Sequence, residues 1–406
     1  MTMLGRTLLA IFVALTSLSA ISQRAREQGV TDTEIRIGNV MPYTGALREF
    51  GSIGKAEAAY FDMINERGGI NGRKVRFISY DDNSEPSSAL DLTRRLIEQD
   101  GVLLMFGSFG TLGNLTARQY LNERQIPQLF VASGDEQFGN PSVFPWTMGW
   151  QPTFRTEGRI YASYIQAIYP GSKIVVLWQN DQFGRALFKG LEDGLGDLAK
   201  MIVVDIAYDI SDAYLDTHIS ILKRSGAEIF VFAGVPSNAV QAIRIAASLN
   251  WHPVFILNDM ASSIGSVLKP AGLENASGVI SASVLKDVND PEWKDDPATR
   301  NWLSFADKYL RGADKDDSAA LFGFAAAETL AQVLRQCGED LSRENVMRQA
   351  AALENYQPSV LLPNIRINTG PWDFRPIKNL RLGQFDGKTW QPIGAVVDTA
   401  FSGAKK

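Results

Sequence analysis

From Glu34 onward, the chain contains two kinds of segment, which differ in how apolar and polar residues are spaced. Short apolar runs such as EIRIGNVM (34–41) and KVRFISYDD (74–82) have the character of buried strands. Between them, segments such as 52–66 repeat apolar residues every three to four positions, as one face of a helix does. Strands that alternate with amphipathic helices predict βαβ units and therefore a parallel sheet.

This alternation runs through the first part of the chain and then repeats. The first set has predicted strands at 34–41, 74–82, 102–107 and 127–133, and helices at 52–66, 87–99 and 112–124. The pattern pauses over FPWTMGWQPTFRTEGR (144–159). The second set has predicted strands at 173–181, 201–209, 228–234 and 253–259, and helices at 183–195, 214–224 and 238–249. Two serial doubly wound sheets follow from this repeat, with a break near 148–151.

The last third of the sequence is mostly helical and ends in β-structure. Its periodicity predicts helices over 297–310, 319–337 and 342–353. Strands are predicted at IRINTG (365–370) and within NLRLGQFDGKTWQPIG (379–394), where Asp386–Gly387 marks a hairpin turn. We therefore predict an α/β fold of two doubly wound, parallel-sheet lobes.

The first residues have the order of charge and hydropathy that is typical of a secretory signal. One positive charge lies within Met1–Arg6, an apolar run follows at Leu8–Leu18, and small residues come next. The run is too short to span a bilayer comfortably, and an uncleaved N-terminal anchor is the competing interpretation. We expect a signal peptide at 1–22, cleaved near Ala20–Gln23, and hence an exported protein.

Composition narrows the classes of function. The 406 residues are 45% hydrophobic and carry a net charge of only −5, without a basic block interleaved with aromatics, so we expect no nucleic-acid partner. Cys337 is the only cysteine, and the core must therefore hold the fold together without a disulfide. His218 and His252 lack a partner suited to catalysis, and none of the motifs H-E-x-x-H, C-x-x-C and G-x-S-x-G occurs. We expect no catalytic residue, no metal and no cofactor.

Candidate binding residues lie where predicted strands end and helices begin, the edge at which doubly wound sheets bind ligands. The stretch GSFGTLG (107–113) has the spacing of neither a dinucleotide fingerprint nor a phosphate loop. Its glycines and the hydroxyls of Ser108 and Thr111 suit a smaller anion, such as a carboxylate at a helix N-terminus. The alternative is a structural turn in which Ser108 and Thr111 cap the helix.

A second turn of the same kind ends the neighbouring strand at Ala132, Ser133 and Gly134. Two adjacent turns that are poor in bulk and rich in donors favour a carboxylate cradle more than either does alone. Phe50 precedes a predicted helix and is interpreted as an apolar wall of this site. A hydrophobic staple for that helix is the alternative role for Phe50.

The second set of strands offers matching positions. Phe183 follows Asp181 at one strand end, Val235 follows another, and Asp259 follows a third. Asp259 is a candidate acceptor for a ligand ammonium group. The alternative is that its carboxylate caps the next turn.

These residues resemble the leucine/isoleucine/valine-binding type of periplasmic binding protein, the solute receptors of ABC importers. The resemblance runs from about Glu34 to Val397, and its most specific stretch is INERGGINGRKV (64–75) with the Asp-Asp pair that follows. Further matching stretches are GSFGT, VASGDEQFGNPSVFPWTMGWQP and DQFGRALFKGLEDGL. The stretch FPWTMGW is similar to a subgroup associated with aromatic or other non-standard carboxylates.

The resemblance implies the type I fold, in which two lobes joined by three crossing strands close on a ligand. The N-terminal lobe would comprise 30–148 and 286–361, and the C-terminal lobe 151–281 and 362–400. It also implies that a ligand carboxylate is held by the positions that correspond to Thr111, Ala132, Ser133 and Gly134. The family's aromatic residue ahead of the first helix corresponds to Phe50.

Departures from the family's pattern leave the ligand open. Gly134 stands where the amino-acid receptors have Thr, Val235 stands where they have a cleft Tyr, and Phe183 lacks the usual hydroxyl. Asp259 falls near the family's ammonium-binding acid and favours an α-amino acid. Gly134 and Val235 favour an apolar or aromatic acid without an amine.

We therefore expect a periplasmic, monomeric receptor and not an enzyme. It would capture a branched-chain or other hydrophobic amino acid, or a related small carboxylate, and present it to the membrane permease of an ABC importer. A receptor for an aromatic carboxylate without an amine is the alternative ligand class. From other classes, the alternatives are an NAD-type enzyme on a doubly wound scaffold, which lacks its fingerprint here, and a ligand sensor module.

Overall fold

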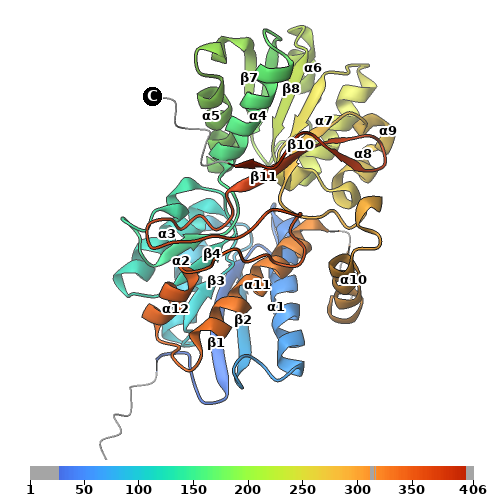
Figure 1. Ribbon diagram of the computed structural model, residues 1–406. Coiled ribbons are helices and arrows are strands. Elements are labelled where there is room, and N and C mark those ends of the chain that lie inside the picture. Colours follow the sequence, from blue (N-terminus) through green and yellow to red (C-terminus); the bar gives the residue numbers. More distant parts are fainter. Residues whose placement is uncertain (1–26, 311–314, 316, 399–406) are drawn as a thin grey trace, which may run out of the picture.

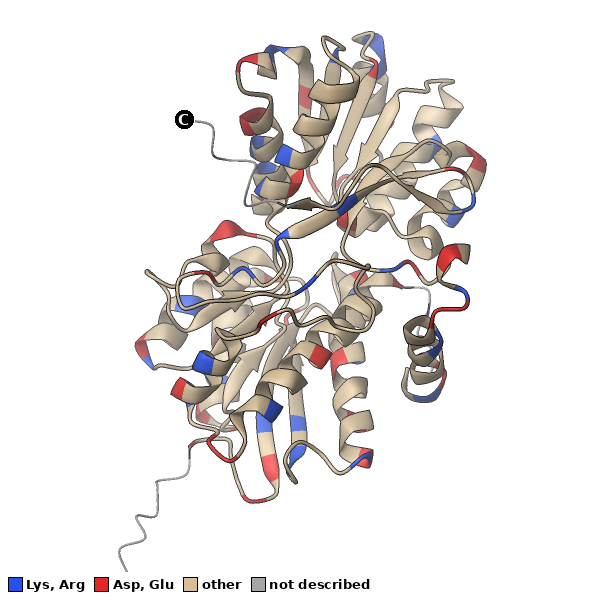
Figure 2. Cartoon of the chain, viewed as in Figure 1, with Lys and Arg blue, Asp and Glu red and all other residues tan. Residues whose placement is uncertain are grey.

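The computed structural model describes residues 27–310, 315 and 317–398, so the predicted signal peptide at 1–22 lies outside the described residues. Two lobes, each a sheet covered by helices on both faces, lie one above the other (Figure 1). Charged side chains of both signs are interspersed over the outer helices and loops (Figure 2). In the described part of the chain, no helix combines the length and hydropathy that crossing a membrane requires.

The first lobe is built on a five-stranded sheet with the order β2-β1-β3-β4-β5, in which every pair is parallel. Its strands are β1 (Glu34–Met41), β2 (Lys74–Asp81), β3 (Leu104–Phe106), β4 (Gln128–Val131) and β5 (Thr147–Gly149). Its helices are α1 (Gly51–Glu66), α2 (Ala89–Glu98), α3 (Thr111–Glu123), α10 (Pro297–Tyr309), α11 (Ser318–Cys337) and α12 (Arg343–Ala350). Helix α11 returns from late in the chain to pack along α1.

The second lobe repeats this layout and extends it. The parallel strands β7-β6-β8-β9-β10 have the same order of connection as the first sheet, and β11 and β12 continue the sheet in antiparallel fashion. Its strands are β6 (Ile174–Gln179), β7 (Ile202–Tyr208), β8 (Ile229–Ala233), β9 (Val254–Leu257), β10 (Ile280–Ser283), β11 (Asn379–Phe385), β12 (Trp390–Pro392) and β13 (Val397–Asp398). Its helices are α4 (Phe154–Ile168), α5 (Gln182–Leu195), α6 (Asp216–Arg224), α7 (Pro236–Ser248), α8 (Lys269–Ala271) and α9 (Leu273–Ala276).

The predicted α/β fold with two parallel-sheet lobes is confirmed, and the errors are local. The predicted pause at 144–159 contains β5 and the start of α4, and β10 was missed altogether. The strand predicted at 365–370 is wrong, because this segment forms only isolated bridges from Ile367 to Tyr356 and from Gly370 to Asp373. Ile365 and Ile367 alternate as in a strand and are buried in the hydrophobic core, but no strand of the described residues pairs with this segment.

The lobes are joined where the chain passes from β5 to α4, from β10 to α10 and from α12 to β11. Two of these crossings pair with each other: the Lys286 N–H donates to the Val360 carbonyl at 3.0 Å, and the Leu362 N–H donates to the Val284 carbonyl at 2.9 Å. Near the third crossing, fully buried Trp150 donates its indole N–H to the Thr329 hydroxyl at 3.1 Å. The exact lobe boundaries given above stay predictions.

Gly107, at the end of β3, is held in a left-handed conformation beside a buried acid. Its φ is +63°, and an added Cβ would overlap Oε1 of Glu57. Asn39 donates to Oε2 of Glu57 at 3.1 Å and to the Phe106 carbonyl at 2.9 Å, which fixes that carboxyl against the turn. Gly72 has a similar φ of +79°, but nothing lies within 4 Å of an added Cβ.

We expect Gly107→Ala to lower the free energy of unfolding by about 3 kcal/mol and the control Gly72→Ala by about 1 kcal/mol. Both substitutions strain a left-handed residue, but only the first also forces a methyl group into a buried carboxyl. Denaturant unfolding followed by circular dichroism measures both losses. Equal losses would show that the Glu57 side chain moves aside without cost.

Candidate functional site

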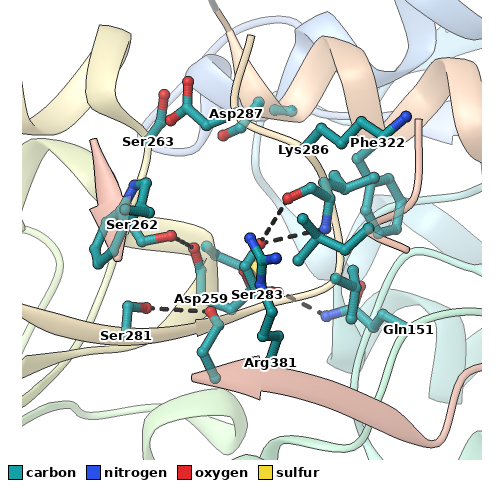
Figure 3. A pocket seen from close by; sticks show the side chains of 18 of the residues that line it. Gln151, Asp259, Ser262, Ser263, Ser281, Ser283, Lys286, Asp287, Phe322 and Arg381 are labelled. Carbon is teal, nitrogen blue, oxygen red and sulfur yellow. Dashed lines mark hydrogen bonds between the residues drawn. The ribbon is translucent and has the colours of Figure 1, made fainter. Parts of the chain in front are cut away.

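Residues just beyond the carboxyl ends of strands in both sheets line one cleft, which has two chambers. The outer chamber has a cavity volume of about 420 Å³, a size typical of ligand pockets, and includes Thr111, Ser133, Phe154, Phe183 and Val235. The inner chamber, of about 100 Å³, lies against the crossing segments and includes Asp259, Ser281, Ser283, Lys286, Phe322 and Arg381 (Figure 3). The two chambers adjoin, since both are lined by Phe50, Phe109, Ala132 and Met260.

The two glycine-flanked turns of the first lobe come together in the outer chamber as the sequence predicts. The hydroxyls of Thr111 and Ser133 are 2.7 Å apart and share a hydrogen bond. Thr111 is the first residue of α3, so these hydroxyls lie at the positive end of a helix dipole. Hydroxyls and helix N-terminal N–H groups are donors that suit a carboxylate.

The capping interpretation of Ser108 and Thr111 is wrong. The N-cap of α3 is Gly110, whose φ is +91°, and no side chain of the described residues caps the helix. The buried Ser108 hydroxyl accepts the Val40 N–H at 3.1 Å, and Ser108 lines neither chamber. Ser108 therefore holds β1 to the turn, while Thr111 keeps its hydroxyl in the cleft.

Ala132 and Gly134 contribute to the second turn through their backbones. The Ala132 N–H donates to the Ser108 carbonyl at 3.1 Å, and the Ala132 carbonyl accepts the Gly110 N–H at 3.2 Å. These bonds tie the two turns to each other. Gly134 lies behind the cleft and lines neither chamber.

The Gly134 position explains one departure from the family's pattern. An added Cβ there would lie 2.7 Å from Cδ1 of Phe154, so this ring occupies the space that a side chain at position 134 would need. Phe154 meets Phe183 edge-to-face at 4.7 Å between ring centroids. The outer chamber has therefore gained an aromatic wall where the resemblance leads one to expect a hydroxyl.

Phe50 lies in the wall of the cleft, as expected. It stacks on Phe109 at 4.5 Å between ring centroids, with an interplanar angle of 18°. Val235 from the other lobe belongs to the same buried apolar cluster as Phe50. An apolar ligand tail in this region would meet side chains from both lobes.

Asp259 lies in the wall of the inner chamber, and the alternative in which it caps the next turn is wrong. The short helix Asp259–Ala261 is preceded by Asn258, and the Asp259 carboxyl instead hydrogen-bonds the Ser283 hydroxyl. Burial raises the pKa of Asp259 well above its usual range, and repulsion from the Glu157 carboxyl raises it further. The Ser283 hydroxyl acts in the opposite direction.

Glu157, on α4, is the acid behind Asp259. It is buried, and its Oε1 accepts the Asp259 N–H and the Tyr161 hydroxyl, each at 2.7 Å. Burial raises the pKa of Glu157 to about 7. Neither of these neighbouring carboxyls ionises easily, and neither is paired with a Lys or Arg among the described residues. Such a pair favours a positive group in the adjacent cavity.

Sequence reasoning missed Glu157, Ser281, Ser283 and Arg381. The serines lie on β10, where they alternate with the apolar residues of VISASV (279–284), and both line the inner chamber. That period of two was a usable signal for a strand with a polar face. Within the described ranges, no group of three or more His, Cys, Asp or Glu side chains is placed to hold a metal ion.

Comparison with known proteins agrees with this geometry. A family model described as "Periplasmic binding protein" matches residues 34–389. An "Amino acid binding protein" from Pseudomonas aeruginosa is 24% identical over 314 residues, which cover 75% of this chain and 79% of that protein.

Solved structures share the fold at low sequence identity. A branched-chain amino acid ABC transporter protein from Thermus thermophilus with bound valine has a TM-score of 0.82 at 17% identity, covering 92% of this chain and 98% of that chain. A solute-binding protein of an ABC transporter from R. palustris in complex with benzoate has a TM-score of 0.73 at 18% identity, covering 90% and 98%. With a family model matched over most of its length and this two-lobed fold, the chain belongs to the periplasmic binding protein family.

Proposed function

We propose that this protein is the periplasmic substrate-binding component of an ABC importer, which captures a hydrophobic amino acid or a related small carboxylate between its lobes. The observation that carries the proposal is the cleft, where the Thr111 and Ser133 hydroxyls on one lobe lie in a chamber with apolar side chains of the other. The names of the relatives support it, because they describe amino-acid binding and structures with valine or benzoate. The permease partner and the monomeric state are parts of the same proposal.

Each part of the proposed ligand meets matching chemistry. A carboxylate accepts from the hydroxyls of the cradle and from the first N–H groups of α3. The tail is removed from water by the rings of Phe50, Phe154 and Phe183, which contributes about 25 cal/mol per Å² of apolar surface. An ammonium group supplies the positive charge that the Asp259–Glu157 pair lacks.

The second candidate ligand is an aromatic carboxylate without an amine. The Phe154 ring in place of a hydroxyl and the apolar Val235 favour it. An enzyme is a weaker hypothesis, because neither His218 nor His252 lines a chamber of the described cleft. Titration with nicotinamide cofactors, which we expect not to bind, separates that hypothesis from ours.

The lobes touch through an acid next to Phe50 in the sequence. Glu49, in the short helix Arg48–Phe50, accepts the backbone N–H of Ser237 at the start of α7 in the other lobe. Burial raises the pKa of Glu49 to about 7, and the nearby Asp317 raises it too, whereas the Ser237 N–H and Arg48 lower it. Burial therefore outweighs the Ser237 N–H, and this carboxyl holds its proton more readily than it does in water.

A ligand screen tests the function directly. We expect at least one of leucine, valine, benzoate and phenylpropanoate to raise the melting temperature, because a ligand that binds only the native state stabilises it. Thr111→Val should weaken binding of that ligand by about 1–3 kcal/mol, since a hydrogen bond to a charged group is lost. Calorimetry measures the change, with Thr116→Val on the exposed face of α3 as the control. Unchanged affinity in Thr111→Val would place the carboxylate elsewhere.

The role of Asp259 is tested with ligands that differ only in the amine. We expect the wild-type protein to prefer leucine to 4-methylpentanoate, and Asp259→Asn to lose about 1.5–3 kcal/mol of binding to leucine alone. Isothermal calorimetry with both ligands gives the two affinities, and the exposed Asp216→Asn serves as control. Equal losses for both ligands would show that Asp259 only shapes the chamber.

The raised pKa of Glu49 predicts that the stability of the folded protein depends on pH. The pKa of Glu49 is about 7 in the folded protein and 4.5 ordinarily, so the folded state binds its proton more tightly than the unfolded state does. The resulting contribution to the free energy of unfolding is fully present below pH 4.5 and is lost as the pH rises through 7. We expect Glu49→Gln to raise the melting temperature by roughly 2 °C at pH 8 and by less at pH 5. Thermal unfolding across this range, with the exposed Glu123→Gln as control, measures it. A difference in melting temperature between Glu49→Gln and the wild type that is the same at every pH would contradict this assignment.

A further inference from the structure

The inner chamber contains a cation to which the proposed function gives no role. Arg381 lies on β11, its side chain is only 16% exposed, and its guanidinium projects toward the middle of the chamber (Figure 3). A guanidinium stays charged at any physiological pH and offers five N–H donors. Its position in a cavity therefore raises the question of what accepts from it.

Strand register points Arg381 into the chamber. Strands β10 and β11 are antiparallel, with Ser283 opposite Arg381 and Ser281 opposite Gly383. Because side chains alternate between the faces of a strand, these four positions share one face, and all of them line the inner chamber. Gly383 has no side chain, and a Cβ added there would lie 3.3 Å from Cε3 of Trp390, which also lines the chamber.

The described surroundings leave the guanidinium of Arg381 short of acceptors. Its nearest acid is Glu292, at 3.8 Å between Nη2 and Oε2, which is beyond hydrogen-bonding distance. Its Cζ lies 5.7 Å from the ring centroid of Trp293, a cation–π contact that uses no N–H donor. Among the described residues, the guanidinium of Arg381 donates no hydrogen bond that meets ordinary geometry.

The other charged groups of the chamber are engaged elsewhere. Lys286 donates to Asp296 at 2.9 Å and to the Ser359 carbonyl at 3.2 Å. Asp287 accepts the Ile264 N–H at 2.7 Å, and Asp290 accepts the Trp390 N–H at 2.9 Å. These groups fix the crossing segments and the β11–β12 hairpin, which leaves Arg381 as the chamber's available anion receptor.

We propose that Arg381 binds a second acidic group of the ligand, so that the substrate class is a carboxylic acid with a further carboxylate at the far end of its chain. This inference rests on the proposed function, which assigns the first carboxylate to Thr111 and Ser133. One molecule can extend between the two seats because the chambers adjoin at the rings of Phe50 and Phe109. Arginine and a carboxylate match each other in bidentate geometry.

The size of the inner chamber agrees with this assignment. At about 100 Å³ it has about a quarter of the volume of the outer chamber, which suits the smaller end of a ligand, such as a terminal carboxylate. Any ring of the ligand then belongs in the outer chamber, beside Phe154 and Phe183. The ligand is therefore apolar in its middle and anionic at both ends.

Pairs of acids that differ only in a terminal methyl or carboxylate test the inference. We expect glutamate to bind at least tenfold more tightly than norvaline, or adipate at least tenfold more tightly than hexanoate, by calorimetry. Arg381→Met should abolish that preference, and Arg381→Lys should keep it at reduced affinity because one positive charge remains. Arg366→Met, at an exposed site, is the control and should leave it unchanged. Circular dichroism verifies that each variant is folded.

The possible outcomes separate this inference from the function on which it rests. If monoacids and diacids bind with equal affinity and Arg381→Met changes neither affinity, Arg381 does not bind a second carboxylate, and this inference is overturned while the receptor function stands. If monoacid binding requires Arg381 but not Thr111, the single carboxylate sits at Arg381 and the two-anion ligand is overturned. If none of these acids nor those of the screen binds, the proposed function fails with it.

Discussion

All strands of a parallel sheet end at the same edge, and this constraint decides where the cleft of this protein lies. The turns after β3, β4, β6, β8 and β9 all leave their sheets on the side that faces the other lobe, and each contributes to a chamber. Because helices follow these turns, helix N-termini also converge there. The two sheets share one order of connection, so the two lobes present equivalent edges to each other.

Within the cleft, the arrangement of charge separates the roles of the two chambers. Hydroxyls and a helix N-terminus in the outer chamber attract an anion without placing a full charge there. The inner chamber has Arg381, which stays charged, and Asp259, whose carboxyl holds its proton more readily than in water because it is buried and faces Glu157. Burial makes each of these groups more sensitive to what it faces, since water no longer screens it. A ligand is therefore contacted by polar groups at separate points along its length.

The aromatic side chains set the width of the passage between these points. Phe50 stacks on Phe109, and Phe154 occupies the space that Gly134 leaves open. Rings give rigid walls at little cost in side-chain entropy, so they define a shape as well as an apolar surface. Phe50 and Val235 belong to one buried apolar cluster, so side chains of both lobes form the passage.

The sequence by itself determined the fold class, most of its elements and the two turns of the cradle. These depend on periodicity and on glycine and hydroxyl residues that are neighbours in the chain, so the information is local. It also indicated Phe50, Thr111, Ser133 and Asp259, which the tertiary structure places in the cleft.

Only the tertiary structure decided what each of these side chains faces. Gly107 must be small because of Glu57, Gly134 because of Phe154, and Asp259 meets Glu157 from a helix about a hundred residues earlier. Nothing in the sequence distinguishes Arg381 from any other arginine in a strand. It lines the chamber because β11 pairs with β10 in the register that places Arg381 opposite Ser283. Such contacts depend on how distant segments pack, which no local pattern of hydropathy encodes.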